Sequence, residues 1–90
     1  MTKKLSIKQY LAALAEPNRL AIMKLLKGGE MCACEIHPKL KLQQNLCSHH
    51  LKVLKDLGLL KSRRNGVEIL YSRDEKAIKN YQNALEETIL

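Results

Sequence analysis

The chain has 90 residues, which allows one small domain and leaves no room for the two-lobed cleft of most metabolic enzymes. Hydrophobic residues make up 46% of the sequence, so disorder is not expected, and the only aromatic residues are three tyrosines, which predicts an aliphatic core. Sixteen Lys and Arg against nine Asp and Glu give a net charge of +7, a surplus typical of domains that bind nucleic acid. No apolar run is long enough for a membrane span, and no membrane partner is expected.

The cysteines and the N-terminus together predict a cytoplasmic protein. The opening Met-Thr-Lys-Lys is not followed by the apolar segment of a secretory signal. The cysteine count is odd, with Cys32 and Cys34 close together and Cys47 apart. Unpaired thiols without an export signal indicate a reducing compartment.

The first half of the chain predicts three helices. Apolar residues at i, i+3, i+4 and i+7 indicate a first amphipathic helix: Ile7, Tyr10, Leu11 and Leu14. Pro17 suits the first position of a second helix, with Glu16 as its cap and Gly28-Gly29 at its end. The apolar side of that helix comprises Leu20, Met23 and Leu26, with Ile22 and Leu25 beside them. A short third helix turns Ala33, Ile36 and Leu40 inward.

The second half predicts a longer helix, a hairpin and a final helix. The fourth helix covers about 43–57 with Leu46, His50, Val53, Leu54 and Leu57 on its buried side. Asn65-Gly66 between two short strands is a strong signal for a hairpin turn, with both residues at positive φ, and predicts a wing at about 61–72. A last helix from about Asp74 has Ile78, Tyr81, Leu85 and Ile89 on one face. The order helix-helix-helix-helix-strand-strand-helix predicts a mainly α, winged helix-turn-helix domain over residues 1–90.

The outward face of the fourth helix is the candidate site for reading double-stranded DNA. Its N-terminal part offers amide, hydroxyl and imidazole groups suited to base edges: Gln43, Gln44, Asn45, Ser48 and His49. Lys52 on the same face, and Lys61, Arg63 and Arg64 in the wing, suit contacts to the DNA backbone or minor groove. Any solvated helix face is polar, but the agreement of charge, helix order and basic hairpin favours DNA binding.

Four short segments form a pattern that is specific when taken in order. They are LAEPNRL at 14–20, EMCACEI at 30–36, SHHL with LGL between 48 and 59, and the hairpin ending in Tyr71. Together they cover roughly residues 5–73 and resemble the ArsR/SmtB family of winged helix-turn-helix repressors, of the arsenic- and metal-responsive type. The resemblance implies a homodimeric repressor, with dimer contacts through the first and last helices, that a ligand releases from its operator.

The resemblance also implies where a metal would bind. The last-helix zinc site of the family is absent, because Lys76 stands where a histidine is expected. The third-helix site remains, with Cys32, Cys34 and His37 as ligands suited to Zn²⁺, Cd²⁺ or Pb²⁺. Arsenite, As(III), prefers three thiolates, so Cys47 or an external thiol would have to complete its site.

Helix geometry predicts how such a ligand would act. Cys32 and Cys34 would lie about 200° apart on an ideal helix, so one ion cannot easily hold both without local unwinding. Pro38 has no N–H for the carbonyl of Cys34, which predicts a frayed or late-starting third helix. A ligand that draws the two thiols together would therefore distort this helix and shift the fourth helix off DNA.

Several alternatives stay open. The two cysteines could be small residues at a helix start with no ligand, or a dithiol that responds to oxidants or persulfide. Cys47 and His50 are expected in the core. A winged helix that binds protein and a metal buffer or chaperone are the competing classes of function. An enzyme is not expected, because no glycine-rich phosphate loop, Ser-His-Asp set or carboxylate pair is present.

Overall fold

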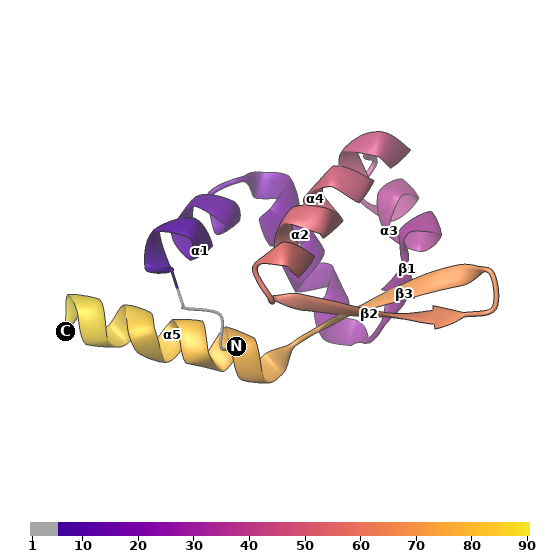
Figure 1. Ribbon diagram of the computed structural model, residues 1–90. Coiled ribbons are helices and arrows are strands. Elements are labelled where there is room, and N and C mark those ends of the chain that lie inside the picture. Colours follow the sequence, from indigo (N-terminus) through magenta and orange to yellow (C-terminus); the bar gives the residue numbers. More distant parts are fainter. Residues whose placement is uncertain (1–5) are drawn as a thin grey trace.

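The computed structural model describes residues 6–90 and arranges them as five α-helices, one 3₁₀ turn and three strands (Figure 1). In chain order these are α1 (Ile7–Leu14), α2 (Pro17–Leu25), η1 (Leu26–Gly28), β1 (Met31–Cys32), α3 (Ala33–Lys39), α4 (Gln44–Asp56), β2 (Leu60–Asn65), β3 (Glu68–Arg73) and α5 (Glu75–Ile89). Helices α1 and α5 lie at one end of the molecule, and the β2–β3 hairpin projects as a wing at the other. The predicted mainly helical fold with a wing is confirmed, and the structure adds one strand.

Side-chain caps fix where three of the helices begin. Ser6, Glu16 and Asp74 each accept a hydrogen bond from the backbone N–H three residues later, at 3.3, 3.0 and 3.0 Å. These bonds satisfy N–H groups that have no partner within the helix. Pro17 occupies the first position of α2, where its missing N–H costs nothing. The predicted start of α2 at Glu16 and Pro17 is thus confirmed.

The added strand, β1, pairs with the wing. The sheet is antiparallel in the order β1-β3-β2, with Met31 opposite Tyr71 and Cys32 opposite Leu70. Two residues are too few to show the alternation by which a strand is found in a sequence. This pairing places Cys32 against the wing rather than in a helix.

The turn of the wing lies one residue later than predicted. Asn65 still pairs with Glu68 in the ladder, so the two central residues are Gly66 and Val67. Gly66 has a φ of +65° and Val67 does not share a positive φ, which is the pattern of a hairpin turn with glycine in its first central position. Val67 at the tip is 97% exposed.

The core lies between α2, α3, α4 and the start of β2. Its fully buried side chains are aliphatic apart from one thiol: Ile22, Ile36, Leu51, Leu54, Leu59 and Cys47. Two residues predicted on buried sides face outward instead, since Leu20 is 53% and Leu46 41% exposed. Both lie at the edge of their apolar sector, where the packing of neighbouring helices decides which side chain is covered.

Helix α5 packs on α1 and also reaches α4. The rings of Tyr10 and Tyr81 are stacked, with centroids 4.7 Å apart and planes 3° from parallel. The hydroxyl of Tyr81 donates a hydrogen bond of 3.0 Å to the carbonyl of Leu57, the C-cap of α4. Within residues 6–90 no helix has the length and apolarity needed to cross a membrane.

Candidate nucleic-acid interface and thiol pair

The outward face of α4 is polar and accessible, as predicted. Gln43 caps the helix, and all predicted base-contacting residues are exposed: Gln43, Gln44, Asn45, Ser48 and His49. The opposite face is held in the core by Cys47, Leu51 and Leu54. The helix is therefore fixed on one side and presents hydrogen-bonding groups on the other, as major-groove recognition requires.

The cations of this interface differ in how they are paired. Lys52 forms an exposed ion pair of 3.0 Å with Asp56 one turn later, a type of contact that contributes little to stability and is easily exchanged for a phosphate. Lys61 and Arg64 in the wing are exposed and make no ion pair with any described residue. These two side chains carry the unopposed positive charge of the wing.

Arg63 is already engaged by a carboxylate. Its guanidinium donates two hydrogen bonds to Glu30, with Nε 3.0 Å from Oε2 and Nη2 on Oε1. This pairing holds the pKa of Glu30 below its ordinary value and raises the pKa of Arg63. A phosphate contact by Arg63 would have to replace Glu30, which sequence reasoning did not identify because it lies 33 residues away.

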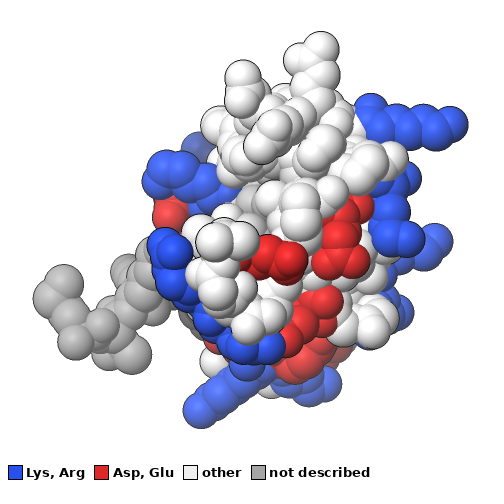
Figure 2. Space-filling view, turned by 90° about the vertical axis from the view of Figure 1, so that its right-hand side faces the viewer, with Lys and Arg blue, Asp and Glu red and all other residues white. Residues whose placement is uncertain are grey.

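Figure 2 shows the end of the molecule that the wing tip occupies in Figure 1. Lysine and arginine side chains lie around the rim of this face, acidic side chains gather near its middle, and its upper part carries neither charge. Basic groups that flank an uncharged region suit backbone contacts on either side of base contacts. The acidic middle is not part of that pattern.

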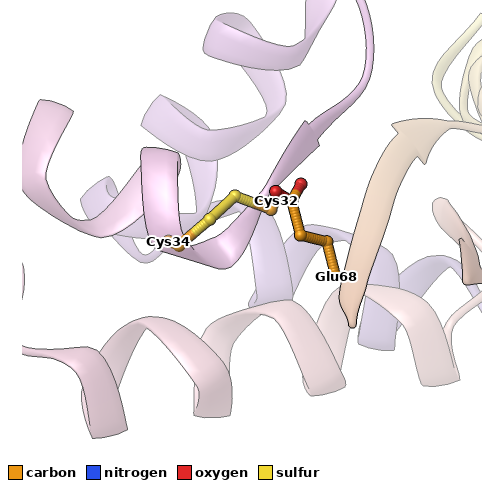
Figure 3. Close-up of side chains that lie close together, drawn as sticks. All are labelled: Cys32, Cys34 and Glu68. Atoms are coloured by element: carbon orange, nitrogen blue, oxygen red, sulfur yellow. A yellow bond between two sulfur atoms is a disulfide. The ribbon is translucent and has the colours of Figure 1, made fainter. Parts of the chain in front are cut away.

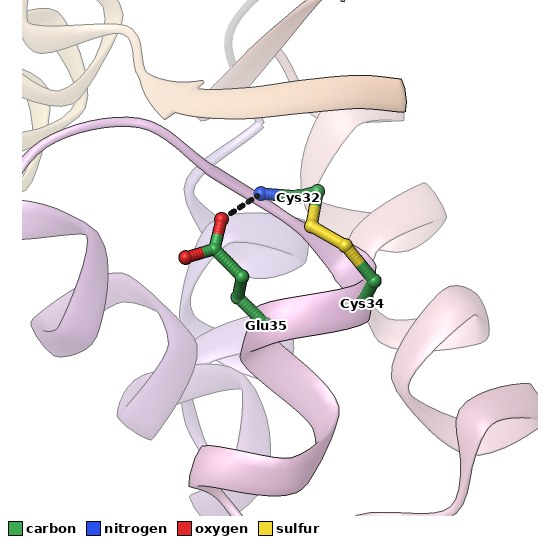
Figure 4. Close-up of a disulfide and its surroundings, with 3 residues drawn as sticks. All are labelled: Cys32, Cys34 and Glu35. Atoms are coloured by element: carbon green, nitrogen blue, oxygen red, sulfur yellow. Dashed lines mark hydrogen bonds between the residues drawn. A yellow bond between two sulfur atoms is a disulfide. The ribbon is translucent and has the colours of Figure 1, made fainter. Parts of the chain in front are cut away.

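Cys32 and Cys34 are joined by a disulfide at the start of α3 (Figure 4). Their Cα atoms are 5.1 Å apart. Cys32 has extended backbone, with φ −80° and ψ 159°, and its N–H donates a hydrogen bond of 3.4 Å to the Glu35 carboxylate. The expected separation of about 200° is wrong, because Cys32 precedes the helix and ends β1. The expectation of three unpaired thiols is corrected as well: within the described residues only Cys47 is free.

The carboxylate of Glu68 faces the thiol pair from the first residue of β3 (Figure 3). The ligand atoms of Cys32, Cys34 and Glu68 all lie within 4.8 Å of one another. His37, the predicted third ligand, does not join this group. It lies three residues beyond Cys34, about 4.5 Å of rise along α3, and away from the junction of strand and helix.

A groove of about 370 Å³ joins the thiol pair to the outward face of α4. Its walls come from α3, α4 and the wing: Cys32, Ala33, Cys34, Gln44, Ser48, Val67, Glu68, Ile69 and Tyr71. Two residues predicted to contact bases, Gln44 and Ser48, thus share one groove with both cysteines. The sequence predicted the two sets separately, and the fold brings them together.

Residues 16–62 match the family described as bacterial regulatory protein, arsR family. The chain belongs to the ArsR family. This match confirms the resemblance seen in the sequence. The family consists of transcriptional regulators and not of enzymes. The matched segment contains α3 and α4 and ends within β2.

Individual members of the ArsR family and one solved structure agree with this assignment. The chain is 33% identical over 80% of its length to a transcriptional repressor, an SmtB homolog, of Synechocystis, and 41% identical over 68% to the arsenical resistance operon repressor of Staphylococcus xylosus. It spans 54% and 59% of these two proteins. The homodimeric winged helix-turn-helix domain of a Mycobacterium bovis protein, described as a possible ArsR-family transcriptional regulator, shares its fold. The TM-score is 0.75 at 24% identity, with coverage of 100% of this chain and 94% of that one.

The other thiol of this ArsR-family chain, Cys47, is fully buried in the core, where it was expected. Burial raises the pKa of its thiol, which makes Cys47 harder to ionise than an exposed cysteine. Cys47 lies on the buried face of α4, and the lining of the groove does not include it.

His50 is likewise buried, whereas its neighbour His49 is exposed. Its Nε2 lies 3.5 Å from Oε2 of Glu16, and its buried Nδ1 has no hydrogen-bond partner within the described residues. Desolvation lowers the pKa of His50, while the charge of Glu16 acts in the opposite direction. His50 therefore packs from α4 against the start of α2 and lies away from the exposed face of α4.

Proposed function

We propose that this ArsR-family chain is a homodimeric repressor that binds double-stranded operator DNA through α4 and the wing. Its base contacts come from the exposed N-terminal part of α4: Gln43, Gln44, Asn45, Ser48 and His49. Its backbone contacts come from Lys52, Lys61, Arg63 and Arg64. Support comes from the opposition of a buried and a polar face on one helix, since a recognition helix must be held rigidly while its other side enters the groove.

The dimer is proposed to form through α1 and α5. Both helices lie at the end of the molecule away from the wing (Figure 1) and carry exposed apolar side chains, among them Leu11 and Ile89. The Mycobacterium bovis domain of the same fold is a homodimer. A two-fold dimer would present two copies of α4 to a pseudo-palindromic site.

The proposed inducer is a thiophilic metal ion held by Cys32 and Cys34. The shared groove supports this proposal, because Gln44 and Ser48 of α4 line the same groove as the two cysteines. A ligand bound to the cysteines would therefore lie close to the proposed base-contacting residues. Two sulfurs and a nearby carboxylate suit Zn²⁺, Cd²⁺ or Pb²⁺. Thiolate ligands require the reduced pair, which the proposed cytoplasmic location would maintain. A related repressor from Staphylococcus xylosus belongs to an arsenical resistance operon.

The disulfide favours a second candidate, a repressor that responds to oxidation. Its formation from two thiols releases two protons and two electrons, which a peroxide accepts as it is reduced to water. The oxidised pair cannot bind metal. Both candidates place the switch at the same two sulfur atoms and differ in the chemical signal.

Fluorescence anisotropy on the DNA upstream of the chain's own gene tests these proposals. We expect the reduced protein to bind this DNA tightly. One of Cd²⁺, Zn²⁺, Pb²⁺ or arsenite should lower the affinity for DNA at least tenfold, which is within the usual range of allosteric coupling. Cys32→Ser and Cys34→Ser should bind DNA but lose the response, and Cys47→Ala should keep it. Release by peroxide alone would favour the redox candidate, and no DNA binding at any salt concentration would contradict the repressor itself.

A further inference from the structure

We propose that Glu68 completes a divalent-cation site with Cys32 and Cys34 and thereby ties the wing to α3. This inference deepens the proposed metal response and rests on it. The two sulfurs and the carboxylate oxygen come from the end of β1, the first turn of α3 and the first residue of β3. Figure 3 shows the Glu68 side chain pointing toward the sulfur pair. All three ligand atoms lie within 4.8 Å of one another in the disulfide form. Reduction breaks the bond between the sulfurs, and an ion could then lie between the two separated thiolates and the Glu68 carboxylate.

The position of Glu68 is set by the sheet and not by a loose loop. Glu68 pairs with Asn65 across the hairpin, and Leu70, two residues later, pairs with Cys32. The same strand therefore aligns the carboxylate and the first sulfur. Backbone hydrogen bonds of the ladder hold both in register whether or not an ion is present.

The donor set determines which ions fit. Two thiolates and one carboxylate suit borderline divalent cations, which accept both sulfur and oxygen ligands. Arsenite forms bonds to thiolates and gains little from a carboxylate, so Glu68 should favour Cd²⁺ and Zn²⁺ over it. Selectivity between these ions would then be set in the wing, outside the β1–α3 segment that carries the cysteines.

The position of this site suggests how a bound cation would lower the affinity of the protein for DNA. If α4 enters a major groove of DNA and the wing enters the adjacent minor groove, the DNA backbone between these two grooves must pass between α4 and the wing. The groove lined by Gln44, Ser48 and Glu68 lies between α4 and the wing. An ion bound to Cys32, Cys34 and Glu68 would fix the wing against α3 and lie in the path of this DNA backbone.

Electrostatics alone would not give this effect. A divalent cation that displaces two thiol protons leaves the total charge of Cys32, Cys34 and Glu68 unchanged. The displaced protons are a direct signature of binding by both thiols. The effect on DNA must come from the fixed wing and the filled groove.

Cadmium titration of the reduced protein without DNA, followed by the absorption of the cadmium–thiolate bonds, tests the role of Glu68. We expect two protons released per ion in the wild type. Glu68→Gln should weaken Cd²⁺ binding by at least about tenfold, the scale seen when groups that support a metal site are removed. Glu35→Gln is the matched control, since it removes an equal charge beside Cys32 but lies outside the ligand group, and it should change affinity less than about threefold.

The outcomes separate this inference from the proposed function. Equal Cd²⁺ affinity of Glu68→Gln and wild type, or equal losses in both Gln variants, would overturn the role of Glu68. A loss confined to Glu68→Gln, with arsenite affinity unchanged, supports it. If the ion binds in this way and DNA affinity stays the same, the site stands and the metal response of the repressor fails. Circular dichroism of each variant checks that the fold is kept.

Discussion

The two faces of α4 differ in burial and polarity. The inner face buries Cys47, Leu51 and Leu54 completely and leaves His50 only 6% exposed. The outer face exposes Gln44, Asn45, Ser48 and Lys52 and makes one ion pair within the described residues, between Lys52 and Asp56. Stability and recognition therefore depend on different residues of the same thirteen-residue helix. Single substitutions should change one property and leave the other intact.

The largest effect is expected on the inner face. Leu51→Ala removes a fully buried side chain and should lower the free energy of unfolding by about 2–5 kcal/mol, since the cavity is only partly refilled. Leu46→Ala on the same helix, where 41% of the residue is exposed, should cost about 1 kcal/mol or less. Urea unfolding measures both. Equal losses would mean that the two faces are not as distinct as their burial indicates.

The second effect is expected on the outer face. Gln44→Ala should weaken operator binding by roughly 1–3 kcal/mol, the value of a side-chain contact to a base, without changing the urea midpoint. Lys24→Gln is the control and should leave both quantities nearly unchanged, because Lys24 is exposed on α2, outside α4, the wing and the proposed dimer helices. Anisotropy titrations give the affinities. A Gln44→Ala variant with wild-type affinity would exclude Gln44 from the interface.

A smaller effect concerns salt dependence. Lys61→Gln should reduce the slope of log affinity against log salt concentration by about 1, because one phosphate contact and its released counterion are lost. Lys24→Gln removes the same charge from α2, outside α4, the wing and the proposed dimer helices, and should keep the slope. Titrations at several salt concentrations provide the measurement. A binding constant insensitive to salt in the wild type would favour a protein-binding winged helix over a DNA-binding one.

The smallest effect separates the two adjacent histidines. Burial lowers the pKa of His50 in the folded state below its ordinary value of 6.5, so the unfolded chain binds more protons at mildly acid pH. The free energy of unfolding should therefore fall as pH decreases below 6.5 and level off once the folded state is protonated too. His50→Gln should flatten this dependence, and His49→Gln on the outer face should keep it. Urea unfolding between pH 5 and 8 measures it.

The sequence predicted those features that depend on periodicity and local signals. Pro17 with Glu16 placed the start of α2, and the polar residues of α4 were separated from the buried ones by helical spacing. Asn65 and Gly66 located the wing but not its register, because Gly66 alone has the positive φ and moves the turn by one residue.

Features that depend on tertiary pairing were missed. β1 is too short to have a period, and its pairing with β3 took Cys32 out of the helix in which it was expected. Glu68 and Glu30 approach Cys34 and Arg63 only through that sheet, at separations of about 30 residues. A family pattern directed attention to His37 instead, since it lies close in sequence. Long-range contacts of this kind leave no local signal in a single sequence.

The hydrogen bond from Tyr81 to the carbonyl of Leu57 links the last turn of α4 to the middle of α5. The Tyr81 ring also stacks on Tyr10, so its position is held from two sides. In a dimer that forms through α1 and α5, the Tyr81 contacts would fix the position of α4 relative to the dimer interface and so set the distance between the two recognition helices. Operators whose half-sites differ from the preferred spacing by a single base pair would then be bound more weakly, and Tyr81→Phe would relax that preference without touching DNA.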